Sequence, residues 1–132
     1  MSERTNNYSV TIESVSEGLN LSAKERIMYK DTQRAVKIDE QTNNGNHLVI
    51  TNPKGYLILT IHNEKSDDKD YKNYVIVDEG GNSFVTGASS FFDTFCDIFA
   101  DMVDSGEDYA IDVYKLPSKN YKGKEFITCS IC

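Results

Sequence analysis

Only one stretch of the sequence combines the length and the apolar spacing of a long helix, which limits the helical content that the fold can have. From Ser90 to Val103, apolar residues recur every three or four positions and form a broad stripe, typical of a helix that packs on a sheet. Ser90 followed by Asp93 resembles a capping box, and Gly106 is placed to end the helix. We therefore expect a mainly β protein with one long helix.

Short segments that alternate apolar and polar residues predict strands on both sides of this helix. Before the helix, the expected strands are residues 35–39, 47–51, 56–62, 74–78 and 83–86. The Asn-Pro-Lys-Gly run at residues 52–55 predicts a tight turn that joins two of them as a hairpin. After the helix, residues 108–132 predict a final hairpin, whose loop contains Pro117, Asn120 and Gly123.

The order of a β-meander, a helix and a final hairpin is that of an OB-fold. We expect one domain over residues 1–132, with an OB-like β-barrel at 33–132 and a short strand and helix at 8–32 as an N-terminal addition. Ser22 and Glu25 match a capping box at the start of that short helix. Residues 1–7 are polar and are expected to be frayed.

Charge is distributed unevenly along this acidic chain, whose net charge is −7. Residues 39–113 carry four lysines and fifteen acidic residues, whereas residues 114–132 carry four lysines and one glutamate. The final hairpin thus reverses the sign of the charge and interleaves lysines with aromatic rings. Such a mixture suits single-stranded nucleic acid, because the lysines neutralise phosphates and the rings stack on bases. The candidate residues are Tyr114, Lys115, Lys119, Tyr121, Lys122, Lys124 and Phe126, with Tyr56 as a further ring.

The stretch from Val113 to Thr128, which follows the helix and the meander, resembles the small single-stranded-DNA-binding proteins of Gram-positive phages and conjugative plasmids. The resemblance covers residues 33–132 in the order of elements and the final hairpin in its residues. It implies an OB-fold that coats single strands during replication or transfer without strong sequence preference. The expected partner is single-stranded DNA, with RNA and self-association along DNA left open. Bacterial members often end in an acidic tail that recruits partners, whereas this chain ends in Thr-Cys-Ser-Ile-Cys.

A ladder of aspartates, Asp93, Asp97 and Asp101 with Asp104 nearby, lies on the helix face opposite the apolar stripe. Like charges four residues apart cost a helix about 0.2–0.5 kcal/mol per pair, and a solvated face is the simplest interpretation. The alternative function uses this ladder: an acidic anti-defence inhibitor that imitates DNA and binds a basic protein. Successive side chains of the ladder would lie about 6 Å apart, comparable with the spacing of phosphates.

No motif in the sequence supplies a catalytic nucleophile, a zinc site or a phosphate-binding loop, so we expect no enzyme activity and no cofactor. Cys129 and Cys132 form a CxxC pair with too few ligands for zinc, and on a strand their sulfurs point to opposite faces. Structural or incidental cysteines are therefore favoured. The sequence has no apolar run of about 18 residues, so we expect a cytoplasmic protein without a membrane partner.

Overall fold

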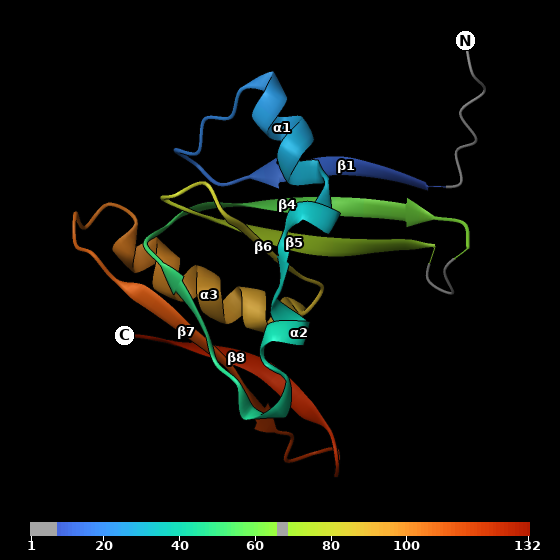
Figure 1. The fold of residues 1–132 in the computed structure, drawn as a ribbon, viewed down its shortest axis with the longest axis vertical. Coiled ribbons are helices and arrows are strands. Elements are labelled where there is room, and N and C mark those ends of the chain that lie inside the picture. Colours follow the sequence, from blue (N-terminus) through green and yellow to red (C-terminus); the bar gives the residue numbers. More distant parts are fainter. Residues whose placement is uncertain (1–7, 66–68) are drawn as a thin grey trace.

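The computed structural model describes residues 8–65 and 69–132, in which eight strands form two separate sheets around one long helix (Figure 1). The predicted fraying of residues 1–7 lies outside the described residues. In chain order the elements are β1 (Tyr8–Val15), α1 (Ala23–Lys30), η1 (Thr32–Arg34), β2 (Val36–Lys37), α2 (Ile38–Gln41), η2 (Asn43–Gly45), β3 (Leu48–Thr51), β4 (Pro53–Asn63), β5 (Asp70–Asp78), β6 (Ser83–Thr86), α3 (Ser89–Met102), β7 (Ala110–Pro117) and β8 (Glu125–Ile131).

The larger sheet has the strand order β1-β4-β5-β6-β2 and is antiparallel except for the β2–β6 pair. Side chains alternate across it, as the sequence predicts for residues 56–62: Leu57 and Leu59 are fully buried on one face, and Tyr56 and Ile58 lie on the other. Leu19, Tyr29 and Ala35, from α1 and its flanking segments, cover the first face. Helix α3 covers the second face.

The N-terminal segment, residues 8–32, contributes a strand to the larger sheet and a helix that packs beside it. Strand β1 pairs antiparallel with β4, from Tyr8 opposite Asn63 to Val15 opposite Leu57. The following helix begins at the predicted capping box: the Glu25 amide donates to Ser22 Oγ at 3.1 Å, and the Ser22 amide donates to the Glu25 carboxylate at 2.9 Å. The capping box is confirmed, and the N-terminal strand of this segment extends the larger sheet at its edge.

The predicted hairpin between residues 47–51 and 56–62 does not form, because β3 and β4 belong to different sheets. Asn52 adopts a left-handed conformation (φ 46°), and its side-chain oxygen accepts from the Tyr109 amide at 2.8 Å. Pro53 follows without an N–H to donate, so the chain leaves one sheet and enters the other within two residues. Strand β3 pairs instead with β7, giving the smaller sheet the order β3-β7-β8. Within residues 8–65 and 69–132 the strands form two sheets and no closed barrel.

Helix α3 confirms the expected long helix, although its cap differs from the prediction. It begins at Ser89, one residue before the predicted cap, and its N-cap is Ala88, whose methyl group cannot act as an acceptor. The amide of Ala88 itself donates to Thr86 Oγ at 3.1 Å. The helix ends at Met102 with Val103 as its C-cap, so Gly106, whose φ is 74°, lies in the following turn and does not end the helix as predicted.

The main core lies where α3 meets both sheets. Phe91 and Phe95 are fully buried, and they share one cluster with Ile76 of the larger sheet and Val113 of the smaller sheet. Each such side chain contributes about 1.5–3 kcal/mol by leaving water. The final hairpin forms as predicted, with Ile127 and Cys129 facing this core.

No helix in the described part of the chain is long and apolar enough to cross a membrane.

Candidate nucleic-acid interface

The tip of the β7–β8 hairpin (residues 118–124) forms a compact turn at one end of the molecule, away from the larger sheet (Figure 1). The Ser118 amide donates to the Lys124 carbonyl at 2.8 Å, and the Lys124 amide donates to the Tyr121 carbonyl at 3.0 Å. Ser118 Oγ accepts from the Tyr121 amide at 3.2 Å. These bonds, with a positive φ (79°) at Gly123, hold the Tyr121 ring outside the sheet.

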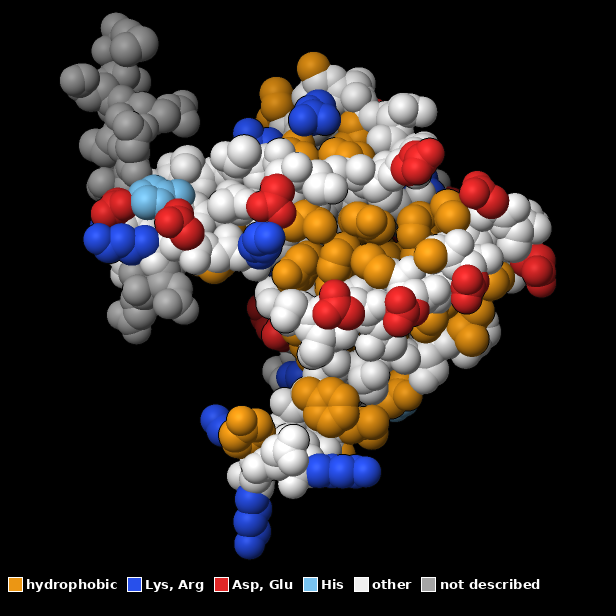
Figure 2. All heavy atoms as spheres, turned by 180° about the vertical axis from the view of Figure 1, so that it is seen from behind, with side chains coloured by type: hydrophobic (Ala, Val, Ile, Leu, Met, Phe, Trp, Pro, Cys, Tyr) orange, Lys and Arg blue, Asp and Glu red, His pale blue; other side chains and the backbone are white. Residues whose placement is uncertain are grey.

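An open groove of about 670 Å³ lies at this end of the hairpin. We call it the tip groove; its lining residues are Leu116, Pro117, Ser118, Lys119, Asn120, Tyr121, Lys124, Glu125 and Phe126. Its apolar side chains are unusually open to solvent, at 68% for Tyr121, 42% for Phe126 and 41% for Leu116. Figure 2 shows these apolar side chains gathered with lysines at the lower end of the molecule.

Strand alternation explains why apolar side chains stand in the groove. Leu116 lies directly opposite Phe126 in the register of the hairpin, and both point to the outer face of the smaller sheet. Ile127, the next residue, points into the core. The sequence predicted Phe126 as a site residue but not Leu116, although the alternation with Tyr114 places Leu116 on the same face.

A second aromatic group lies on this outer face, further from the tip. The rings of His47 and Tyr114 stack with centroids 5.0 Å apart and an angle of 25°. Asp112 holds the imidazole through a 2.9 Å contact to Nδ1, and the Tyr114 hydroxyl lies 2.6 Å from Ser130 Oγ. The sequence did not indicate His47, because the residues around it were expected to pair with β4 rather than with β7.

Two predicted site residues lie elsewhere. Lys115 points away from Tyr114, and its ammonium group donates to the Asp39 carbonyl at 2.9 Å and to Asn43 Oδ1 at 2.6 Å. It therefore holds α2 and η2 against the hairpin. Tyr56 lies on the larger sheet with its ring packed against Phe92 at 5.0 Å, and burial raises the pKa of its hydroxyl. Neither side chain reaches the tip groove.

The remaining lysines are exposed on the hairpin. Lys119 and Lys124 line the tip groove, and Lys122 lies between them in the turn. The groove therefore combines open rings with two ammonium groups, an arrangement that can hold a flat base and an adjoining phosphate.

The predicted aspartate ladder is exposed along α3. Asp93, Asp97 and Asp101 lie on the helix, and Asp104 lies two residues beyond its last residue, Met102. In the part of the chain that the structure describes, these carboxylates form no ion pair. The ladder borders the apolar surface seen in Figure 2, on a different part of the molecule from the tip groove.

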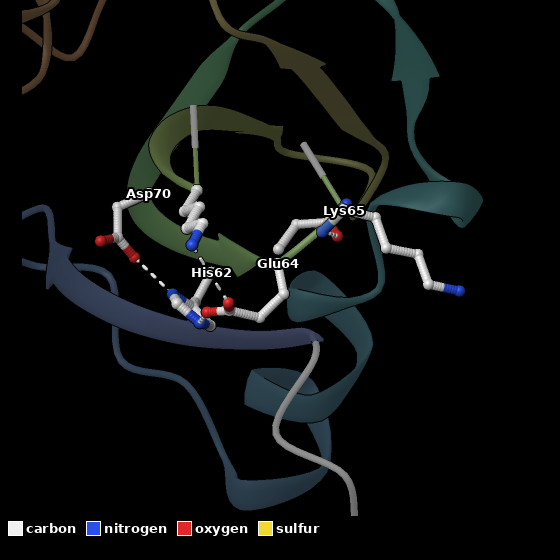
Figure 3. Close-up of polar contacts among 6 residues, drawn as sticks. His62, Glu64, Lys65 and Asp70 are labelled. Atoms are coloured by element: carbon white, nitrogen blue, oxygen red, sulfur yellow. Dashed lines mark hydrogen bonds and ion pairs between the residues drawn. The ribbon is translucent and has the colours of Figure 1, made fainter. Parts of the chain in front are cut away.

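A third polar cluster lies at the far end of the β4–β5 hairpin (Figure 3). His62 Nδ1 lies 2.7 Å from the Asp70 carboxylate, and its Nε2 contacts the Glu64 carboxylate. The hydrogen bond to Asp70, with help from Glu64, raises the pKa of His62 above its ordinary value of 6.5. Among the described residues, no group of His, Cys, Asp and Glu side chains is arranged to hold a metal ion.

Of the two cysteines of the CxxC pair, Cys129 contributes to the core. Cys129 is buried, and burial raises the pKa of its thiol to about 11, so the thiol is protonated and unreactive near neutral pH. Cys132 is exposed, consistent with the opposite orientation expected along a strand. Comparison of the chain with protein families, curated proteins and solved structures finds no match.

Proposed function

We propose that the protein binds single-stranded nucleic acid, with DNA as the favoured partner, and that it does so without catalysis. The tip groove is the observation that carries this proposal, because it keeps Tyr121, Phe126 and Leu116 open to solvent beside Lys119 and Lys124. A contiguous exposed apolar patch often marks an interaction site. A base stacked on Tyr121 or Phe126 would bring its phosphates within reach of the lysines.

The outer face of the smaller sheet extends this surface. Tyr114 and Leu116 are two residues apart on β7, a separation of about 6.6–6.8 Å, and they point to the same side. A strand that leaves the tip groove along β7 therefore meets the stacked rings of His47 and Tyr114 next. We propose these rings as a second position for a base.

An OB-like architecture and a role in phage or plasmid replication or transfer, in the cytoplasm, belong to the same proposal. The order of elements from β4 to β8, a meander followed by a helix and a hairpin, supports the OB-like part. A barrel would require β7 or β8 to pair with the larger sheet, whereas in the described residues they pair within the smaller sheet.

The first test is fluorescence anisotropy with a labelled oligo-dT of about 30–60 nucleotides, with duplex DNA as a control. We expect Tyr121→Ala to weaken binding by about 1–3 kcal/mol, or about 5–150-fold, because it removes one stacking platform. Tyr8→Ala is the matched control, since Tyr8 is also exposed (52%) but lies on β1 in the larger sheet. Equal affinities for the two variants would contradict the proposed site.

The lysines are tested through the salt dependence of the same titration. Lys119→Ala and Lys124→Ala should each lower the slope of log affinity against log salt by about 0.7, the value for one phosphate contact on a single strand. Lys24→Ala, on the exposed surface of α1, is the matched control and should leave the slope unchanged. Affinity that does not vary with salt would rule out phosphate binding by this hairpin.

A second candidate function is supported by the uninterrupted acidic surface of α3. The exposed carboxylates of Asp93, Asp97 and Asp101 suit a basic protein partner better than a nucleic acid, which they repel. Neutralising all three as asparagines should abolish capture of such a partner without loss of the fold. Capture that persists in this triple variant would exclude an inhibitor that imitates DNA through this ladder.

A further inference from the structure

An exposed apolar strip lies beside the aspartate ladder (Figure 2). Tyr56 and Tyr74 of the larger sheet form one side of the strip, and both are half-buried against Phe92 of α3, with ring centroids 5.0 and 4.3 Å from it. Cys96 and Val103 extend the strip along the helix on the same side as Phe92, and Val103 is 42% exposed. We call this surface, together with the acidic row Asp93, Asp97 and Asp101, the α3 strip.

The α3 strip and the hairpin tip have complementary chemistry. Residues 89–108 contain six acidic residues and no lysine or arginine, whereas the hairpin tip, residues 118–124, contains three lysines and no acidic residue. Each charged set stands beside apolar side chains at the surface. These are exposed Val103 and the two half-buried tyrosines on the strip, and exposed Leu116, Tyr121 and Phe126 at the tip. An interface needs this pairing of apolar contact with opposite charge.

We propose that the hairpin tip of one copy of the chain docks on the α3 strip of a second copy. The tip lies at one end of the molecule, where it can approach another copy, and the strip lies on the body (Figures 1 and 2). Because the two surfaces differ, the contact is heterologous, and association continues from copy to copy instead of closing as a symmetric dimer. The basic partner of the acidic helix is then the chain itself.

Self-association of this kind competes with the proposed binding of nucleic acid. A single strand and the α3 strip both offer negative charges beside apolar surfaces, so both occupy the same residues, Lys119, Tyr121 and Lys124. Excess oligonucleotide should therefore dissociate the assembled copies. This competition rests on the proposed function, whereas the docking of tip on strip does not.

The test is sedimentation velocity over a range of protein concentrations, at low salt and at about 1 M salt, where the Debye length is about 3 Å. At low salt we expect the sedimentation coefficient of the wild type to rise with concentration, and at high salt to return to that of a monomer. A strip variant (Asp93→Lys, Asp97→Lys, Asp101→Lys) and a tip variant (Lys119→Glu, Lys122→Glu, Lys124→Glu) should each stay monomeric. The strip variant keeps a like-charge ladder on α3, so the helix experiences a similar repulsion.

Mixing the strip variant with the tip variant should restore association, because each acidic surface then meets a basic one on the other variant. Lys24→Glu with Arg26→Glu is the control, since both side chains are exposed on α1, and it should self-associate like the wild type. A wild type that stays monomeric, variants that still associate, or a mixture without association would overturn the proposal. Capture of a different basic protein by a monomeric wild type would also overturn it.

Adding oligo-dT separates this proposal from the proposed function. Dissociation of the wild-type assembly by oligo-dT supports both the docking and a shared site at the tip. If the charge-reversed mixture associates but oligo-dT neither binds nor dissociates the assembly, the docking stands and nucleic-acid binding fails. If oligo-dT binds a wild type that never self-associates, the docking fails and nucleic-acid binding stands.

Discussion

At the scale of single residues, His62 links the charge of the protein to its stability. Its ring lies between the carboxylates of Asp70 and Glu64, which come from the two sides of the β4–β5 turn (Figure 3). The positive form of the ring gains two ionic hydrogen bonds in the folded state that the unfolded chain lacks. The pKa of His62 is therefore higher in the folded than in the unfolded protein.

A group with a raised folded pKa stabilises the protein fully at pH below its unfolded pKa, which is 6.5 for His62, and loses this effect as pH rises through the folded pKa. We expect the free energy of unfolding of the wild type to fall between about pH 5.5 and about pH 8.5. His62→Gln should remove this component, and Asp70→Asn should reduce it. Urea titrations at the two pH values measure the effect, and the same pH dependence in wild type and His62→Gln would contradict it.

At the residue scale, the sequence predicts the orientation of a side chain well where that orientation depends only on alternation along one strand. Alternation along β8 accounts for the outward orientation of Phe126 and the inward orientation of Ile127. The same rule separates Tyr114 from Lys115, so adjacent candidates in the sequence face opposite sides of the sheet. A list of basic and aromatic residues that are adjacent in the sequence therefore overestimates how many of them share one face of a strand. Tyr121 lies in a turn, where side chains do not alternate between two faces.

At the scale of elements, α3 combines a strongly stabilising face with a weakly destabilising one. Its phenylalanine rings stack one after another along the helix. The ring centroids of Phe91 and Phe95 are 6.5 Å apart, and those of Phe95 and Phe99 are 5.5 Å apart. The opposite face carries the aspartate ladder, whose repulsion is small compared with the burial of these rings. The free energy of burying the rings therefore outweighs the repulsion between the aspartates, which would destabilise the helix in isolation.

Asp97 is the central member of the ladder and repels both Asp93 and Asp101. We expect Asp97→Asn to raise the free energy of unfolding by about 0.4–1 kcal/mol at low ionic strength, since it removes two like-charge pairs. Urea denaturation measures the gain, which should shrink at high salt because the residues are exposed. Asp104→Asn, outside the helix, should give a smaller gain, and an equal one would contradict the ladder as the cause.

Element-scale prediction succeeded for α3 and for the final hairpin, whose periodicity is strong and local. It failed at residues 47–56, where the turn residues Asn52 and Pro53 suggested a hairpin. The actual conformation depends on the hydrogen bond that the Tyr109 amide donates to Asn52 Oδ1, and Tyr109 lies beyond α3 in the chain. No local pattern reports such a distant partner.

At the scale of the whole molecule, α3 joins the two sheets into one cooperative unit. Phe95 is fully buried in the cluster that contains residues of both sheets. The N-terminal segment adds a second core on the other face of the larger sheet. Loss of α3 packing should therefore disrupt both sheets together rather than release the smaller one alone.

We expect Phe95→Ala to lower the free energy of unfolding by about 3–5 kcal/mol, the range for truncating a buried aromatic ring. Unfolding should remain a single transition, in which the amide signals of Ile76 and Val113 disappear at the same urea concentration. Phe126→Ala is the control, since this ring is 42% exposed and its loss should change stability by less than about 0.5 kcal/mol. Separate transitions for the two sheets would contradict the single unit.

The pairing of β3 with β7 also determines when the protein can fold during its synthesis. All strands of the larger sheet precede α3 in the chain and can pair before β7 is synthesised, whereas Leu48 of β3 must wait for Val113. Until β7 and β8 emerge, Ile50 and the phenylalanines of α3 lack part of their cover. A nascent chain that stalls before Ala110 would therefore expose apolar surface that chaperones and proteases recognise. Synthesis of the last two strands thus determines whether the chain escapes degradation.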